Sequence, residues 1–111
     1  MKEPMQSSEF YIVYCTVPDR TSGQTIAEAL VKEELCACVN RLPGVTSHYI
    51  YEGEYFEEPE EMLLIKTTSE AFERLKVRIA ELHPYEVPEM IATGIAEGND
   101  RYLSWVRSRV K

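Results

Sequence analysis

The feature that most constrains the fold is the run VTSHYIYEGEYF, which spans Val45–Phe56. Its β-branched and aromatic residues favour an extended strand. Twelve extended residues would reach about 40 Å at ~3.3 Å per residue, which is longer than one small domain needs. The overhanging part would leave backbone N–H and C=O groups unpaired, and such edges must be covered or paired. We therefore expect this segment to pair with neighbouring subunits and to close the edges in a ring.

Alternation along this run predicts two faces, because successive side chains of a strand point in opposite directions. One face would carry Tyr49, Tyr51 and Tyr55, and the other His48, Ile50 and Phe56. The segment that follows, 57–61, is read as an acidic turn, and Pro43–Gly44 is read as a break before the run.

The rest of the chain alternates strand-like and helix-like segments. The expected strands are 10–17, 45–56, 62–68 and 90–96, and the expected helices run from about 21 to 35, from about 69 to 82 and from 100 onward. Thr21 and Gln24 match a capping box for the first helix, and Asp100 can cap the last. The resulting order, β-α-β-β-α-β-α, predicts an α+β, ferredoxin-like fold with one antiparallel sheet and helices on one face.

The length, charge and cysteine content of the chain limit the classes of protein to which it can belong. Its 111 residues predict a single domain at 9–111, preceded by a flexible N-terminal tail at 1–8. The net charge of −7 argues against nucleic-acid binding, and no apolar run approaches the ~18 residues of a membrane span. The opening MKEPMQSSEF lacks the apolar core of a signal peptide. Three cysteines cannot form a closed disulfide framework, so we expect a cytoplasmic protein.

Five side chains could carry chemistry, and each has a structural alternative. Cys15 lies near the end of the first expected strand, where it could be a core residue or a thiolate ligand. Cys36 and Cys38 lack a second pair, so small buried residues are expected rather than a zinc knuckle. His48, among aromatics, favours a packing or interface role. His83 ends a helix between restrictive prolines, which suits a site and a structural turn equally. No nucleophile–base signature or phosphate loop is present, so we expect no enzyme.

Several short segments together resemble the CutA family of trimeric divalent-cation tolerance proteins. These are YCTVPD at 14–19, ACVNRLPGVTSHYIYEGE at 37–54, IKTT at 65–68, LHPYEVPE at 82–89 and YLSWV at 102–106. The resemblance implies the same ferredoxin-like fold and a homotrimer in which long hairpins of neighbouring subunits pair. It also implies a role in tolerance of copper and other divalent ions, with no established catalytic reaction and no required cofactor.

The resemblance further implies a metal site. By position, Cys15 and His83 match the ligands attributed to bacterial members, so weak binding of Cu or Zn through a thiolate and an imidazole is expected. Leu82 stands where some members have a second histidine. Glu54 stands where the family usually has a lysine at the hairpin.

A second hypothesis also comes from the resemblance. Lys66, Tyr85 and Glu89 match polar positions near a cleft between subunits, with Tyr51 and Glu52 of the hairpin close by. Such a cleft would suit a small anionic or zwitterionic metabolite, as in the PII signalling proteins, whose trimeric architecture is similar. The structural alternative is that these groups form interface salt bridges and hydrogen bonds.

Overall fold

The computed structural model describes residues 8–111, and seven elements follow one another along this part of the chain. They are β1 (Phe10–Val17), α1 (Arg20–Lys32), β2 (Cys38–Tyr51), β3 (Glu54–Thr68), α2 (Phe72–Leu82), β4 (Ile91–Gly94) and α3 (Asp100–Arg109). The strands form one antiparallel sheet in the order β2-β3-β1-β4, which confirms the predicted ferredoxin-like α+β fold. The predicted tail at 1–8 lies outside the described residues, apart from Ser8.

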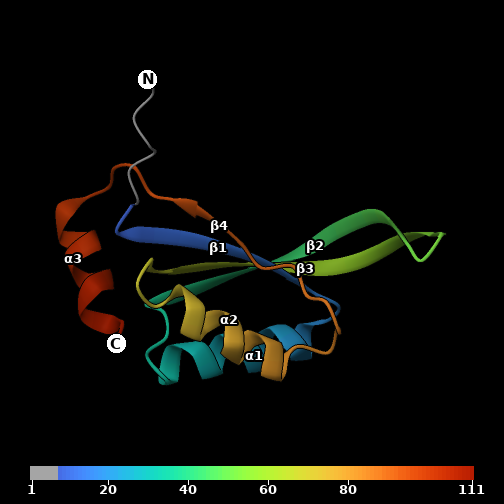
Figure 1. Ribbon diagram of the computed structural model, residues 1–111, viewed down its shortest axis with the longest axis horizontal. Coiled ribbons are helices and arrows are strands. Elements are labelled where there is room, and N and C mark those ends of the chain that lie inside the picture. The colour runs from blue at the N-terminus through green and yellow to red at the C-terminus, as the bar shows by residue number, and fades with distance from the viewer. Residues whose placement is uncertain (1–7) are drawn as a thin grey trace.

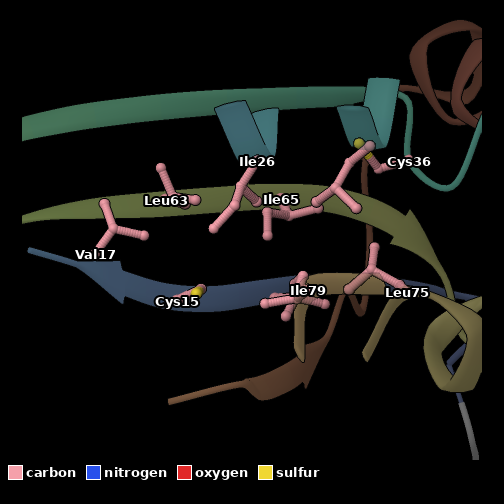
Figure 2. Packing of buried hydrophobic residues seen from close by; sticks show 10 residues of the cluster. Cys15, Val17, Ile26, Cys36, Leu63, Ile65, Leu75 and Ile79 are labelled. Carbon is pink, nitrogen blue, oxygen red and sulfur yellow. The ribbon is translucent and has the colours of Figure 1, made fainter. Parts of the chain in front are cut away.

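Helices α1 and α2 cover one face of the sheet (Figure 1). Alternation in β1 turns Val13, Cys15 and Val17 toward them, and β3 contributes Leu63 and Ile65. Figure 2 shows Cys15, Val17, Leu63 and Ile65 in one cluster with Ile26 of α1 and with Leu75 and Ile79 of α2. Helix α3 packs separately at one end of the sheet, in a second, smaller cluster of buried residues made of Phe10, Ala37 and Val106.

The overlong run is a hairpin and not a single strand, so that prediction was wrong. Strands β2 and β3 are joined by a two-residue turn at Glu52 and Gly53, whose φ values of 51° and 81° lie in the left-handed region. Such turns match the right-handed twist of the strands on either side. The segment 57–61, expected as a turn, lies within β3. The hairpin extends well beyond the helices (Figure 1).

The turn also changes which hairpin side chains share a face. Residues directly opposite each other in an antiparallel pair lie on the same face. Tyr49 is opposite Phe56, with ring centroids 5.3 Å apart, and Ile50 is opposite Tyr55. His48 Nδ1 lies 2.6 Å from the Tyr55 hydroxyl, so Tyr55 shares a face with His48 and Ile50. The predicted grouping of Tyr55 with Tyr49 was wrong because the chain reverses between them.

Three smaller expectations were also corrected. Asp19, rather than a Thr21–Gln24 capping box, caps α1, because its side chain accepts a hydrogen bond from the Ser22 N–H. Asn99, rather than Asp100, caps α3. The Pro43–Gly44 segment is a bulge inside β2, where the register shifts between Leu42 and Val45, so the strand continues through it.

The sheet face opposite α1 and α2 carries a cluster of apolar side chains that is partly open to solvent. Cross-strand pairing places Tyr14 beside Leu64 and Ile91, and Leu42 beside Met62, all on this face. Leu42 is 41% exposed and Ile91 is 59% exposed. An antiparallel sheet whose second face is solvated is normally polar on that face. We call these five residues, together with Ile12, the open sheet face.

Candidate functional site

A cleft of about 790 Å³ lies between the hairpin and the loop that follows α2. Its lining comes from four places: the end of β1, the two arms of the hairpin and the loop at 84–89. The residues are Thr16, Ser47, His48, Tyr49, Tyr51, Glu52, Glu60, Pro84, Tyr85, Glu86, Val87 and Glu89. This volume falls within the range of small-molecule sites in proteins, about 300–1,000 Å³.

His83 and Tyr85 fasten the loop to the sheet. The His83 ring nitrogen Nε2 lies 2.8 Å from the carbonyl oxygen of Thr16, and the Tyr85 backbone N–H donates to His83 Nδ1 at 3.1 Å. Because a carbonyl only accepts and a backbone N–H only donates, His83 is the neutral tautomer protonated on Nε2. The Tyr85 hydroxyl donates to Glu60 Oε2 at 2.7 Å. These bonds hold the cleft wall against β1 and β3.

The cleft is acidic. Glu52, Glu60, Glu86 and Glu89 line it, and no lysine or arginine of the described chain does. Partial desolvation and the nearby Glu60 raise the pKa of the Glu89 carboxyl above its ordinary value of 4.5. Desolvation and the hydrogen bond to Glu60 likewise raise the pKa of the Tyr85 hydroxyl. An arrangement of carboxylates without counter-charges favours cations over anions.

The two predicted metal ligands lie close to the cleft, but neither lines it. Cys15 is fully buried, and burial, followed by the charges of Glu89 and Glu60, raises the pKa of its thiol to about 12. A metal ligand must be the thiolate. His83 is buried as well, and both of its ring nitrogens are in hydrogen bonds. In this conformation the pair therefore offers no free donor atom to a metal.

No ready-made metal centre exists among residues 8–111, because no group of three or more His, Cys, Asp or Glu side chains is placed to hold an ion. The carboxylates of the cleft are spread along its walls. Any cation bound by this single chain would keep much of its water, so its binding would be weak.

The structure brings together four of the five predicted cleft residues. Tyr51, Glu52, Tyr85 and Glu89 all line the cleft. Lys66 does not: it lies toward the other end of β3, opposite Cys38 of β2, and its ammonium donates to Asn40 Oδ1. The cation that was expected to recognise an anionic metabolite is therefore absent from this cleft.

Sequence reasoning missed Glu60 and Thr16, although each of them helps to hold the cleft wall. Glu60 was assigned to an acidic turn at 57–61. Placing the turn at Glu52–Gly53 would have put Glu60 inside a strand that is largely buried at that point. Thr16 acts through its carbonyl oxygen, and the sequence pattern carries no signal for a backbone group.

The fold and the cleft define a small ferredoxin-like α+β protein with an acidic cleft beside a long hairpin. The family model described as CutA1 divalent ion tolerance protein matches residues 11–109, and the chain belongs to this family. The "Divalent-cation tolerance protein CutA" of Thermus thermophilus is 54% identical over 96 residues, covering 86% of this chain and 93% of that protein.

Two further comparisons extend this result. The solved structure of a divalent cation tolerance protein from Thermus thermophilus superposes with a TM-score of 0.90 at 51% identity, covering 92% of this chain and 99% of the other. The "Protein CutA, chloroplastic" of Arabidopsis thaliana is 40% identical over 111 residues, and this chain spans 61% of its length. The name of this relative places it in the chloroplast, whereas a CutA structure from Archaeoglobus fulgidus is described as periplasmic. Among the described residues, no helix is long and apolar enough to cross a membrane.

Proposed function

We propose that this chain takes part in divalent-cation tolerance as a non-enzymatic homotrimer, and that copper or another divalent ion binds it weakly beside the cleft. The observation that carries the proposal is the acidic cleft, in a chain whose relatives are named for divalent-cation tolerance. Its free cysteines, Cys15, Cys36 and Cys38, suit the reducing cytoplasm.

The open sheet face supports the homotrimer. Apolar surface of this kind is expected to be covered by another protein surface, because its exposure to water is unfavourable. The outer edge of β2 supports it as well, since β2 has 14 residues and pairs only with β3 among the described strands. A long unpaired edge is a template for another strand. Pairing of hairpins between three copies would cover both features.

Two sets of ligands compete within the metal proposal. The first is Cys15 with His83, which would require ionisation of a buried thiol and loss of the Tyr85 N–H bond to the imidazole. The second is Glu60 with Glu89, both of which line the cleft. Copper prefers the sulfur and nitrogen donors, whereas a harder ion prefers the carboxylates. We expect weak binding at the first set because the thiol must ionise and a hydrogen bond must break. We expect weak binding at the second set because the carboxylates are spread along the cleft walls.

Calorimetric titration with Cu and with Zn separates the two sets. The variants are Cys15→Ser with His83→Ala, and Glu60→Gln with Glu89→Gln, each checked for folding by circular dichroism. Glu70→Gln with Glu81→Gln, at exposed positions of α2 or just before it, is the matched control. We expect saturable binding that one variant pair abolishes and the control keeps. Uptake unchanged in both test pairs would contradict the proposed location.

A second candidate function is PII-like regulation, in which a small metabolite binds in a cleft completed by a neighbouring subunit. The volume of the cleft and its tyrosines favour it, and the acidic lining favours a cationic or zwitterionic compound. A thermal-shift screen with amino acids, polyamines and nucleotides tests this idea. A stabilising compound should lose its effect in Glu89→Gln and keep it in Lys66→Ala, because Lys66 lies outside the cleft.

A further inference from the structure

We propose that the exposed aromatic surface of α3 is the docking surface for the hairpin tip of a second copy of this chain. The surface consists of Tyr102, Trp105, Arg101 and Arg109. This inference rests on the proposed homotrimer and adds to it a specific contact, which can fail while the homotrimer stands.

Helix α3 presents an aromatic surface that nothing in the described chain covers fully. Its inward residue, Val106, is buried against the end of the sheet. Tyr102 lies one turn before Val106 and Trp105 lies directly before it; they remain 42% and 43% exposed, with ring centroids 5.6 Å apart. Residues three apart on a helix are neighbours, so the two rings form one surface. Half-exposed tryptophan and tyrosine are typical of the centre of a protein–protein contact.

The same face is positively charged. Arg101 and Arg109 are exposed, at positions four before and four after Trp105, and neither forms an ion pair with another described residue. Arg107 differs from them, because its guanidinium is bound to Glu9 at 2.6 Å. Two free arginines beside two aromatic rings fit a partner that is both apolar and acidic.

The hairpin tip has that chemistry. Ile50 and Tyr55 lie opposite each other across the strands and are 73% and 60% exposed. Glu52, Glu54 and Glu57 surround them, and no lysine or arginine occurs anywhere between positions 45 and 61. The tip therefore offers apolar contact to the rings and carboxylates to the arginines.

One chain cannot make this contact with itself. The hairpin tip and α3 lie at opposite ends of the molecule (Figure 1). A contact between unlike surfaces of identical chains is head-to-tail, and such contacts either close into a ring or continue as a filament. Three copies, each placing its hairpin tip on the α3 of the next, would use every tip and every helix once.

Trp105 is the only tryptophan of the chain, so its fluorescence reports on α3 alone. The experiment compares acrylamide quenching of the wild type, Ile50→Asp and the control Val77→Asp, an exposed position on α2. Light scattering on the same samples gives the mass relative to the 12.8 kDa chain. We expect quenching to rise at least twofold in Ile50→Asp and to stay unchanged in Val77→Asp, although neither change touches α3.

Charge exchange gives an independent test of the pairing. Arg101→Glu with Arg109→Glu should expose Trp105 to acrylamide, and so should Glu54→Arg with Glu57→Arg. The chain that carries all four changes should restore the wild-type quenching. If the wild type is trimeric but Ile50→Asp and the arginine pair leave quenching unchanged, the α3 contact is wrong and the homotrimer stands. A wild-type mass of one chain would overturn both.

Discussion

At the scale of single residues, the histidine of the HPY segment has a defined structural role. His83 accepts a hydrogen bond from the Tyr85 N–H and donates one to the Thr16 carbonyl, so it joins the cleft wall to the first strand. Cys15 lies one residue before that carbonyl and is enclosed in the core. Both residues were predicted as candidate site residues from the sequence. Their burial and the direction of their hydrogen bonds could not be predicted, because they depend on contacts between segments that are distant in the sequence. The sequence therefore singled out His83 and Cys15, but it could not show the contacts that hold them.

The three thiols should differ in reactivity. Burial raises the pKa of Cys15 and of Cys36 to about 12, whereas Cys38 is only partly buried. The thiolate is the reactive form, so Cys38 should be modified first by iodoacetamide at mildly alkaline pH, with the other two protected until the protein is unfolded. Peptide mass spectrometry over a time course measures this order. Modification of Cys15 as fast as Cys38 would contradict its burial.

Replacement of Glu89 should change the pH dependence of stability. A carboxyl whose pKa is raised in the folded state binds its proton more tightly there than in the unfolded chain. Its neutral form therefore favours folding at low pH, and this benefit is lost as the pH rises through the folded-state pKa. Glu89→Gln should increase the free energy of unfolding modestly at pH 7, and the increase should vanish below its ordinary pKa of 4.5.

Urea unfolding at neutral pH and at a pH just below 4.5 checks this expectation. The control is Glu86→Gln, another exposed glutamate of the same loop. A gain that is equal at both pH values, or a loss at neutral pH, would show that Glu89 is not disfavoured as a carboxylate in the folded cleft.

At the scale of elements, the β2–β3 hairpin carries the main difference between expectation and structure. The helices and the first strand were predictable because their apolar residues repeat at helical spacing or form one short buried run. The turn at Glu52–Gly53 was missed because glutamate is uncommon in the left-handed region, whereas asparagine before glycine would have marked it. The error then reversed the faces of the residues beyond the turn, since side chains alternate with period two.

One substitution in this turn should stabilise the folded protein. Glu52 has φ of 51°, a conformation that costs most L-residues about 1 kcal/mol and that asparagine tolerates better. We expect Glu52→Asn to increase the free energy of unfolding by roughly 0.5–1 kcal/mol in urea denaturation. Glu54→Asn, two positions on in the strand, is the control and should give no increase, because asparagine is disfavoured in strands. Destabilisation by Glu52→Asn would mean that the Glu52 carboxylate makes a needed contact.

At the scale of the whole molecule, the ferredoxin-like fold with its single antiparallel sheet was predicted from the sequence, but the cleft was not. The cleft exists because the loop after α2 returns past the end of β1 while the hairpin extends beside it. Hydrophobic periodicity predicts single helices and strands, and it does not give the position of this loop relative to the hairpin. Lys66 shows the limit: it matches a cleft position by resemblance, yet the register places it opposite Cys38, away from the carboxylates.

The open sheet face gives a prediction at this scale. Leu64 lies in the middle of it, opposite Tyr14. Leu64→Glu places a charge on surface that we propose to be covered by other copies, and burying an unpaired charge is costly. Light scattering should show the mass falling from three chains to one, while Val77→Glu on the outer side of α2 leaves it unchanged. A trimer that tolerates Leu64→Glu would show that assembly leaves this face in water.

Because of the unpaired edge of β2 and the open sheet face, the stability of the folded chain should depend on the concentration of the protein. Association that covers them binds only folded chains, so by mass action it draws the population away from the unfolded state. The melting temperature should then rise with protein concentration, in contrast to that of a self-sufficient monomer. A cell could adjust how long each folded chain survives simply by how many copies it makes, without any change in the sequence.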